Sequence, residues 1–426
     1  MKRFNAPAEA SLSELEVAVL APYARPSLRR ALRSANYRLY LAGQVVSLLG
    51  TWIQKMAQGW LVYRLTNSPA LLGLTTFCGA IPIFFTAPFG GMVADRFDRR
   101  KLLLSTQSAA MIQAAILAIL TLSGLIQPWQ IIVLALILGL IDGIDVPTRH
   151  SLTLDMVDKV DLRAAIALNS ILFNFGRIIG PSLAAIALAL GGEGVCFAIN
   201  AASFGAVLLT LRRIRLPNRQ PRVSKHPLHE IAEGYRYSLS RPEIRTPLLL
   251  VAISSMFGAA YVTLMPAIAR DYLHGTASSY GILMGASGTG AVLGAYLLSR
   301  FPEHWLDRAP AIAAMLFGLG LLIFSCSRHL WLSVALLIPT ATCLMVLGGS
   351  ANTLVQISAA HEYRGRAISH YTQCFLGMMP WGALVLGALA SYIGSTKSVA
   401  VGGGIVALSG LVSYRWDASN SRHEAR

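Results

Sequence analysis

Apolar stretches long enough to cross a membrane recur along the chain from residue 39 to about residue 416. A helix needs about 20 consecutive, mostly apolar residues to span a bilayer. Polar or glycine-rich breaks divide these stretches into separate segments. The predicted spans are 39–63, 70–93, 102–124, 129–147, 166–190, 194–211, 246–269, 279–299, 310–327, 331–354, 367–392 and 396–414. The pattern predicts an all-α membrane protein with twelve transmembrane helices.

Composition agrees with this pattern. Hydrophobic residues make up 54% of the chain, charged residues only 13%, and mean hydropathy is +0.56, whereas soluble domains carry about 25% charged residues. The five cysteines all lie in apolar segments and none has metal-ligand spacing, so we expect no disulfide, metal or cofactor. Clustered catalytic groups and a phosphate-binding loop are both missing from the sequence, which argues against an enzyme or a primary pump.

The distribution of positive charge predicts the orientation. Of the 36 lysines and arginines, four fall on one side and two within spans, which leaves 30 on the other side. The four outer residues are Arg64, Arg270, Arg328 and Lys397. Cytoplasmic loops collect Lys and Arg, so both termini are predicted to be cytoplasmic. The net charge of +16 is therefore explained by membrane topology, and we expect no nucleic-acid partner.

A polar stretch near the middle of the chain separates six predicted spans from six more. The halves also resemble each other, because Arg163–Asn169 aligns with Arg364–His370 in an equivalent place. We expect two pseudo-symmetric six-helix bundles. The predicted divisions are an N-terminal tail (1–35), a first half (36–211), a central cytoplasmic loop (212–245), a second half (246–416) and a C-terminal tail (417–426).

A dense charged turn over residues 90–101 joins the second and third predicted spans. After two glycines it carries Asp95, Arg96, Asp98 and Arg99, followed by two more cations. This run resembles the signature turn of the major facilitator superfamily, although Asp98 stands where that family usually has glycine. The resemblance implies the major facilitator fold and transport by alternating access, with the site between two halves at mid-membrane.

Three further runs, Asp145–Arg149, Leu162–Ser170 and Phe173–Pro181, resemble one bacterial branch of that superfamily. This branch contains enterobactin-type siderophore exporters and macrolide or multidrug efflux pumps. The resemblance implies a monomeric, multi-pass protein of the bacterial inner membrane. Its partners would be a small-molecule substrate, protons and the lipid bilayer.

The first predicted span carries a polar face. Its residues, spaced three or four apart along the helix, are Gln44, Ser47, Thr51, Gln54, Lys55 and Gln58. Such a face meets either a partner helix or a water-filled cavity, because lipid does not satisfy polar groups. We predict that Gln44, Thr51, Gln54, Lys55 and Gln58 line a substrate cavity, with helix–helix hydrogen bonding as the alternative. Lys55 has a further alternative, which is to extend toward the outer interface.

Arg177 lies near the centre of the fifth predicted span, where an arginine needs an interior partner. It is predicted to line the cavity, together with Asn169, Phe173 and Asn174. A structural ion pair between helices is the alternative for Arg177.

The same span contains Gly176, Gly180 and Pro181, in a pattern that resembles the antiporter motif of the superfamily. Small residues allow close helix packing and proline removes a hydrogen bond, so this segment is predicted to be a bent, tightly packed hinge.

The charged turn is predicted to act as a cytoplasmic gate. Asp95 is expected to meet the amino end of the eleventh span, with Arg96 beside it. Arg99 is expected to pair with Asp142 or Asp145 at the cytoplasmic end of the fourth span. Asp142, Asp145 and Arg149 are three and four residues apart and so share one helix face. Topology alone is the alternative explanation for the cations of this turn.

Together these features favour a secondary active transporter that exports small amphipathic molecules, drug-like compounds or siderophores, by proton-coupled alternating access. A proton symporter that imports a nutrient and a transport-inactive sensor or scaffold are the alternatives. No acidic residue lies near the middle of any predicted span, so the sequence assigns no proton carrier.

Overall fold

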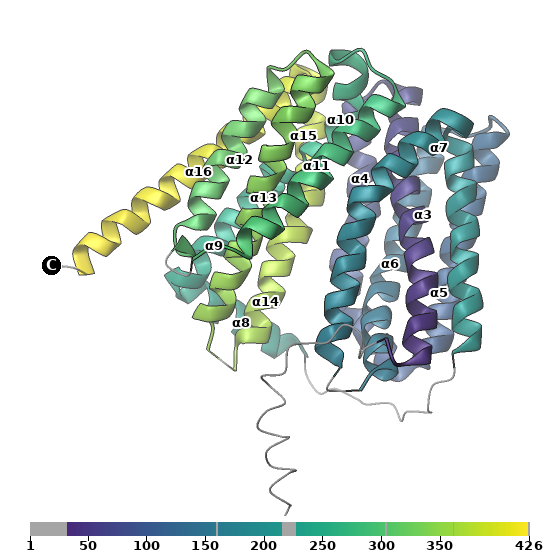
Figure 1. Ribbon diagram of the computed structural model, residues 1–426, viewed down its shortest axis with the longest axis horizontal. Coiled ribbons are helices and arrows are strands. Elements are labelled where there is room, and N and C mark those ends of the chain that lie inside the picture. Colours follow the sequence, from purple (N-terminus) through teal and green to yellow (C-terminus); the bar gives the residue numbers. More distant parts are fainter. Residues whose placement is uncertain (1–31, 159–160, 215–226, 303–304, 361, 425–426) are drawn as a thin grey trace, which may run out of the picture.

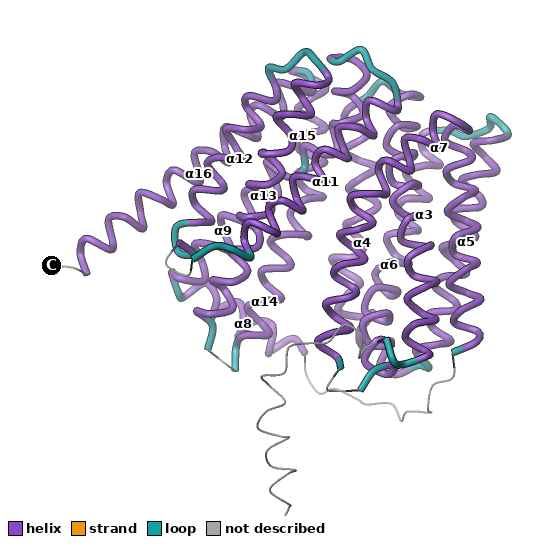
Figure 2. The backbone as a smooth tube through the Cα atoms, in the orientation of Figure 1, coloured by secondary structure: helices purple, strands orange, loops and turns teal. Residues whose placement is uncertain are grey.

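The structure, a computed structural model, describes all residues except 1–31, 159–160, 215–226, 303–304, 361 and 425–426. The described part is almost entirely helical and contains no strand, as Figure 2 shows. Its elements are α3 (Ala35–Thr66), α4 (Pro69–Arg96), α5 (Arg99–Leu122), α6 (Pro128–Met156), α7 (Leu162–Arg213), α8 (Pro227–Ser240), α9 (Pro242–Ile253), the π-helical turn η1 (Ser254–Ala259), α10 (Tyr261–Ala267), the π-helical turn η2 (Ile268–Tyr272), α11 (Ala277–Leu298), α12 (Ala309–Ser325), α13 (Leu330–Ser358), α14 (Arg364–Thr372), the π-helical turn η4 (Gln373–Gly377), α15 (Met378–Ile393) and α16 (Ser395–Glu424).

Eight helical segments of the described chain are long and apolar enough to cross a membrane. They are Arg99–Leu122, Pro128–Met156, Ile179–Arg213, Pro242–Tyr272, Ala277–Leu298, Leu330–Ser358, Arg364–Ile393 and Ser395–Trp416. Pro69–Ile83 and Ala309–Ser325 are shorter apolar helices. α3 is 32 residues long but too polar for this set, because its polar face lowers its hydropathy. The all-α membrane class is thus confirmed, while the count of twelve spans stays a prediction.

α7 contains the fifth and sixth predicted spans in one element of 52 residues. Its backbone leaves helical geometry at Gly192, where φ is +70°. L-residues with a side chain rarely adopt this conformation, so glycine permits the chain to reverse here. The reversal falls in the predicted gap between residues 190 and 194.

Two groups of helices make up the molecule (Figure 1). α3 to α7 lie on the right of the view and α8 to α16 on the left. In the first group α3 packs along α7 and α4 along α6, whereas in the second α11 packs along α13 and α12 along α16. The predicted boundaries of the two halves stay predictions, and residues 1–31 of the predicted tail (1–35) lie outside the described part.

The two groups contact each other mainly through two helix pairs, α4 with α15 and α7 with α11. Glycines make both contacts close. A Cβ on Gly73 of α4 would collide with the carbonyl of Ala383 in α15, and one on Gly281 of α11 would collide with Ala185 of α7. These residues all lie toward the end of the helices that contains Thr66 and Pro69, here named the outer end because the charge distribution predicts it to be extracellular. In Figure 1 the groups approach each other toward the top of the view.

The central polar stretch contains a helix of its own, α8, which packs against α14. The ring of Tyr237 stacks on Tyr363 at 4.1 Å, and its hydroxyl accepts a hydrogen bond from the backbone N–H of Ala360 at 2.9 Å. Ser238 bonds the imidazole of His370 at 2.9 Å. These contacts attach the described part of the predicted central loop to the second half.

Candidate functional site

The polar face of α3 divides into two edges in the structure. Ser47 and Gln54 are only 2% and 1% exposed and pack inside the first half. The side chain of Gln54 donates to Oε1 of Gln113 at 3.2 Å and accepts from Nδ2 of Asn200 at 2.8 Å. Gln54 therefore joins α3 to α5 and α7, and the prediction that it lines a cavity is wrong in this conformation. Helix–helix hydrogen bonding, the alternative, describes this edge.

The second edge of α3 faces α6. Oε1 of Gln44 accepts a hydrogen bond from Nη1 of Arg149 at 3.2 Å. Lys55 is exposed, and its Nζ lies 5.8 Å from the ring centroid of Trp52 in the same helix. Its predicted place in the cavity lining stays a prediction.

Thr51 and Gln58 are half-buried residues of the same polar face. The Thr51 hydroxyl donates to the carbonyl of Ser47 at 2.9 Å, one turn earlier. That bond occupies the hydroxyl proton within α3 itself. Their predicted places in the cavity lining stay predictions.

Asp145 of α6 is the centre of a buried polar network. It is 1% exposed, and its Oδ1 accepts from the hydroxyl of Thr106 at 2.7 Å and from Nε2 of Gln107 at 2.8 Å. Its Oδ2 forms an ion pair with Arg149 one turn later. A buried carboxylate needs such donors to offset its lost hydration. The predicted shared face of Asp145 and Arg149 is confirmed, and it holds α3, α5 and α6 together.

The helix that carries Asp142 extends well past the predicted end of the fourth span. α6 runs to Met156, well beyond the predicted end at residue 147, so Asp142 lies 14 residues from Pro128 in a helix of 29 residues. At 1.5 Å per residue this is about 21 Å from the start of the helix and near its middle. A helix of 29 residues is about 44 Å long, longer than a hydrocarbon core of about 30 Å, so the predicted position of Asp142 and Asp145 at the cytoplasmic edge stays a prediction. Hydropathy falls after residue 141 because the helix begins to bury polar groups against α3 and α5, while the helix itself continues.

The charged turn is organised differently from the prediction. Arg99 donates to Oδ2 of Asp155 at 2.8 Å and to the carbonyl of Ser151 at 3.2 Å. Both partners lie on the last turns of α6. Arg99 does not pair with Asp142 or Asp145 in this conformation, and the pairing stays a prediction for the opposite, outward-open state. Arg96 is exposed at the end of α4. The side chain of Asp95 lies outside the described part, and its predicted contact stays a prediction.

Asp98, the residue that departs from the family pattern, caps α5. Its Oδ1 accepts a hydrogen bond from the backbone N–H of Lys101 at 3.0 Å. Aspartate is among the preferred residues at this position, because its carboxylate satisfies an N–H that the first helical turn leaves unpaired. The substitution therefore gives the turn a defined helix start.

The Gly-Pro segment of α7 packs closely on α3, as its spacing predicts. A Cβ on Gly176 would lie 2.9 Å from the side chain of Leu48, and one on Gly180 would collide with Trp52. Pro181 is buried one residue later, and the only non-helical backbone inside the described part of α7 is Gly192. The predicted close packing is present, and its use as a hinge stays a prediction.

The other predicted residues of α7 have different outcomes. Asn169 is half-buried, and its Oδ1 lies 3.4 Å from the hydroxyl of Tyr37, which anchors the start of α3. The side chains of Phe173, Asn174 and Arg177 lie outside the described part. Their predicted roles in the cavity are therefore carried forward as proposals.

Contacts that the sequence did not reveal close the outer end between the halves. The hydroxyl of Tyr63 bonds the carboxylate of Asp271, and the guanidinium of Arg270 lies 5.9 Å from the Tyr63 ring. Nearby, Trp60 stacks with Tyr280 at 6.2 Å. Aromatic residues near span ends are common as interface anchors, so their positions in the sequence do not indicate that these residues meet across the two halves.

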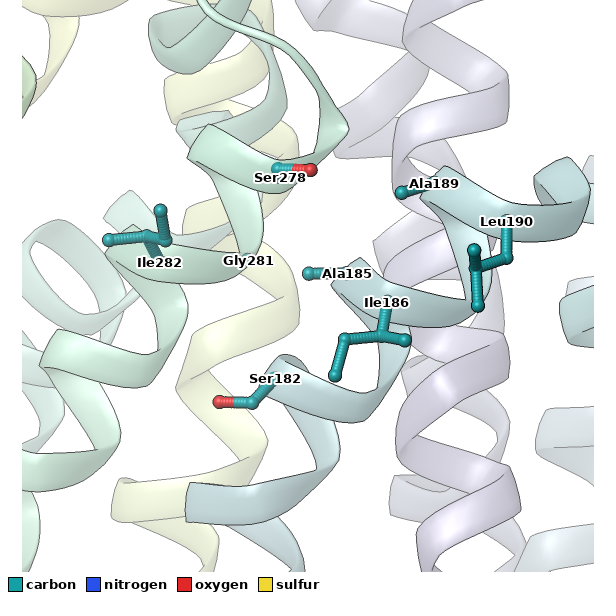
Figure 3. Close-up of a pocket in the computed structure, with 8 residues that line it drawn as sticks. All are labelled: Ser182, Ala185, Ile186, Ala189, Leu190, Ser278, Gly281 and Ile282. Carbon is teal, nitrogen blue, oxygen red and sulfur yellow. The ribbon is translucent and has the colours of Figure 1, made fainter.

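A groove of about 390 Å³ also lies between the halves, on the outer part of α7 and α11 (Figure 3). Its lining is mostly apolar and comes from both helices: Ser182, Ala185, Ile186, Ala189, Leu190, Ser278, Gly281 and Ile282. Ile186 and Leu190 are 56% and 84% exposed, so the groove is open at the periphery. The residues that line this groove carry no charge.

Comparisons of this chain with known proteins agree on one family of transporters. The family described as transmembrane secretion effector, within the major facilitator superfamily, matches residues 28–425. The staphyloferrin A transporter of Staphylococcus aureus (strain NCTC 8325 / PS 47) is 24% identical over 86% of this chain and 92% of its own length. The macrolide efflux protein A of Streptococcus pyogenes is 25% identical over 83% of this chain and 89% of its own length. The enterobactin exporter of Citrobacter koseri (strain ATCC BAA-895 / CDC 4225-83 / SGSC4696) is 25% identical over 88% of this chain and 90% of its own length.

The fold comparison agrees. A bacterial homologue of the human lysosomal transporter Spinster, in an inward-facing and occupied conformation, superposes with a TM-score of 0.69 at 13% identity. The match covers 92% of this chain and 97% of that structure. Such low identity supports the fold alone. Because the family match covers nearly the whole chain, this protein is a multi-pass, non-enzymatic transporter of the transmembrane secretion effector family in the major facilitator superfamily.

Proposed function

We propose that this protein is a proton-coupled exporter of small amphipathic molecules, such as drug-like compounds or siderophores. It would act in the bacterial inner membrane as a monomer with both termini in the cytoplasm. The family membership supports secondary transport, and the relatives named as exporters of a siderophore and as a macrolide efflux protein support the direction. The outward direction, the protons and the substrate class belong to the proposal.

The observation that carries this function is the closed outer end. Tyr63 and Asp271 join the halves there, and glycines bring α7 and α11 into contact on the same side. With the orientation that the charge distribution predicts, this conformation receives substrate from the cytoplasm. Export would then require the outer contacts to open while the cytoplasmic ends approach each other.

The first half supplies the polar residues for this cycle. Gln44, Thr51, Lys55 and Gln58 would line the substrate path from α3, and Asn169, Phe173, Asn174 and Arg177 would do so from α7. The charged turn with Asp95, Arg96 and Arg99 would close the cytoplasmic end. Gly176, Gly180 and Pro181 would provide the close packing around which the halves rock.

Energised efflux tests this function. Cells that lack their main pumps are loaded with a panel of cationic dyes, macrolides and siderophores, and express either the wild type or Arg177→Ala. We expect loss of at least one compound that a protonophore abolishes and that the variant reduces strongly. Proton-driven accumulation of the same compound would instead indicate an importer. The absence of any movement across a broad panel would favour a transport-inactive role.

If efflux persists in Arg177→Ala, export stands and the arginine has a structural role. A conservative Arg177→Lys variant separates these cases further, because lysine keeps the charge but loses the planar donor geometry. Restored efflux in that variant would indicate that charge alone is needed at this position.

A further inference from the structure

We propose that Asp142 carries the coupled proton and that Lys55 is its charge partner, an inference that rests on the proposed proton-driven export. Asp142 lies near the middle of α6, and Lys55 lies 11 residues before the end of α3. At 1.5 Å per residue, Lys55 is about 16 Å from the outer end of its helix and Asp142 about 21 Å from the outer end of its own. By this count the two groups lie at similar depths on α3 and α6, which are in contact, and inside the membrane-spanning part of the molecule, where a charged group is rare and generally functional.

The contrast with Asp145 shows why Asp142 is the residue that can exchange a proton. Asp145 accepts hydrogen bonds from Thr106 and Gln107, pairs with Arg149 and is 1% exposed. These contacts engage both oxygens of its carboxylate. Asp142 is half-buried, and no described side chain donates a hydrogen bond to it. One carboxylate is locked in a structural network, while its neighbour one turn away is free to change state.

The charged groups around Asp142 come from two helices. Lys55 of α3 acts on it, as do Asp145 and Arg149 of α6. α5 contributes only neutral donors to this region. α4 faces α6 with Gly79 and Thr86, and its described cation, Arg96, is at the far end of the helix. Since Asp145 and Arg149 neutralise each other, Lys55 is the partner whose interaction changes most when Asp142 gains a proton.

This arrangement also gives the sign of the coupling to substrate. An antiporter requires that proton and substrate compete, so the substrate must interact more favourably with the ionised carboxylate than with the neutral acid. Groups that donate hydrogen bonds or carry positive charge meet this condition, whereas anionic groups do not. An anionic substrate would bind better when Asp142 is protonated, because the charge of Lys55 is then unneutralised. Proton and substrate would then bind together, as in a symporter. The pair therefore favours cationic or donor-rich amphipathic substrates.

The first test needs no substrate. Spin labels at Ser105→Cys and Glu362→Cys, both exposed near the cytoplasmic ends of the two halves, report the distance between the halves in a background without the five native cysteines. We expect the distribution of distances between the two labels to shift with pH in the wild-type background. In Asp142→Asn we expect no such shift. Asp142→Glu, which keeps a carboxyl, should restore it. Glu193→Gln is the control, because that carboxylate pairs with Arg64 at the outer end, 2.7 Å away. A pH response that persists in Asp142→Asn would overturn the proposal.

The second test measures transport in inverted membrane vesicles with ethidium as the cationic probe. An imposed pH gradient should drive uptake in the wild type and in Glu193→Gln. In Asp142→Asn we expect driven uptake to fall on the order of tenfold, a typical coupling factor, while exchange of labelled for unlabelled ethidium continues. Undiminished gradient-driven uptake in Asp142→Asn would overturn the proton-carrier assignment but leave export intact. If the wild type moves neither ethidium nor the rest of the panel, the proposed export fails, and the spin-label result alone decides whether Asp142 is a proton-sensitive group.

Discussion

The two halves of this transporter are built in different ways. The first half contains a polar interior, with Gln54, Asp145 and Arg149 linked by side-chain hydrogen bonds across α3, α5, α6 and α7. In the second half, α11, α12 and α13 contain no Asp, Glu, Lys or Arg at all. Its helices meet through glycines, and π-helical turns interrupt α9–α10 and α14–α15.

This difference suggests that the two halves contribute differently to transport. Polar groups in a membrane interior specify helix positions and provide charges that can respond to protons or substrate. Close glycine contacts and π-helical turns instead allow helices to approach and deform, and π-helical turns often occur at functional sites. Under the proposed function, the first half would interact with substrate and protons while the second half would supply the moving surface.

The largest effect is expected from removing the carboxylate at the centre of the first half. Asp145→Ala removes the buried half of an ion pair and leaves the half-buried Arg149 without its partner; breaking a buried pair in this way typically costs about 3–5 kcal/mol. We expect a strong drop in thermal stability in detergent. Asp155→Ala is the matched comparison, because its carboxylate is 14% exposed against 1% for Asp145, and its removal should therefore have a smaller effect. Equal stability losses in both variants would remove the special role of the buried network.

The corresponding change in the second half is Gly382→Val. A side chain at Gly382 would collide with the backbone carbonyl of Met256 in η1, which cannot move aside as a flexible side chain would. Overpacking of this kind costs about 1–3 kcal/mol. Gly404→Val is the control, since a Cβ there meets no atom within 4 Å. Thermal unfolding of both variants in detergent should rank Gly382→Val well below the control; similar values would contradict close glycine packing in this half.

The junction between the halves is tested by Tyr63→Phe. The variant removes the hydrogen bond to the Asp271 carboxylate, and bonds to charged groups contribute about 1.5–3 kcal/mol. Because the bond exists only when the outer end is closed, we expect more outward-open protein, measured by labelling of a cysteine introduced at the outer end. Tyr37→Phe removes a bond inside the first half, 2.9 Å from the carbonyl of Ala165, and should leave the labelling unchanged.

The smallest effect is expected at the helix cap of the charged turn. Asp98→Ala should lower stability by about 1 kcal/mol, while Asp98→Gly should cost only a few tenths, because glycine is tolerated at this position. Chemical denaturation of the purified protein distinguishes the two. If alanine and glycine behave alike, the carboxylate does not cap α5 in solution.

Much of this fold follows from hydrophobic spacing alone. The predicted break between the fifth and sixth spans coincides with Gly192, and the Gly-Pro segment makes the close contact with α3 that small residues at that spacing predict. Asp145 and Arg149 share a helix face, as their separation of four requires. These features depend on local sequence, which is why the sequence contains them.

Depth and partners were harder to predict. The fall in hydropathy predicts that the fourth span ends at residue 147, because polar residues usually mark the end of a membrane span. α6 instead packs these residues inside the molecule and continues to Met156. The polar spacing also predicts that Gln54 lines a cavity. Its hydrogen-bond partners, Gln113 and Asn200, lie far away in the sequence, so no local pattern reveals them. The outer contact of Tyr63 with Asp271 depends on how two halves dock, which no local pattern encodes.

The most direct test of the central claim is the direction and energy source of transport. Inverted membrane vesicles acidified on the inside are given the panel of dyes, macrolides and siderophores, and uptake is followed before and after nigericin collapses the pH gradient. The account predicts gradient-dependent accumulation of a cationic amphipathic compound, lost on collapse and strongly reduced by Asp142→Asn. Proton-coupled movement of that compound in the opposite direction would contradict export by this protein.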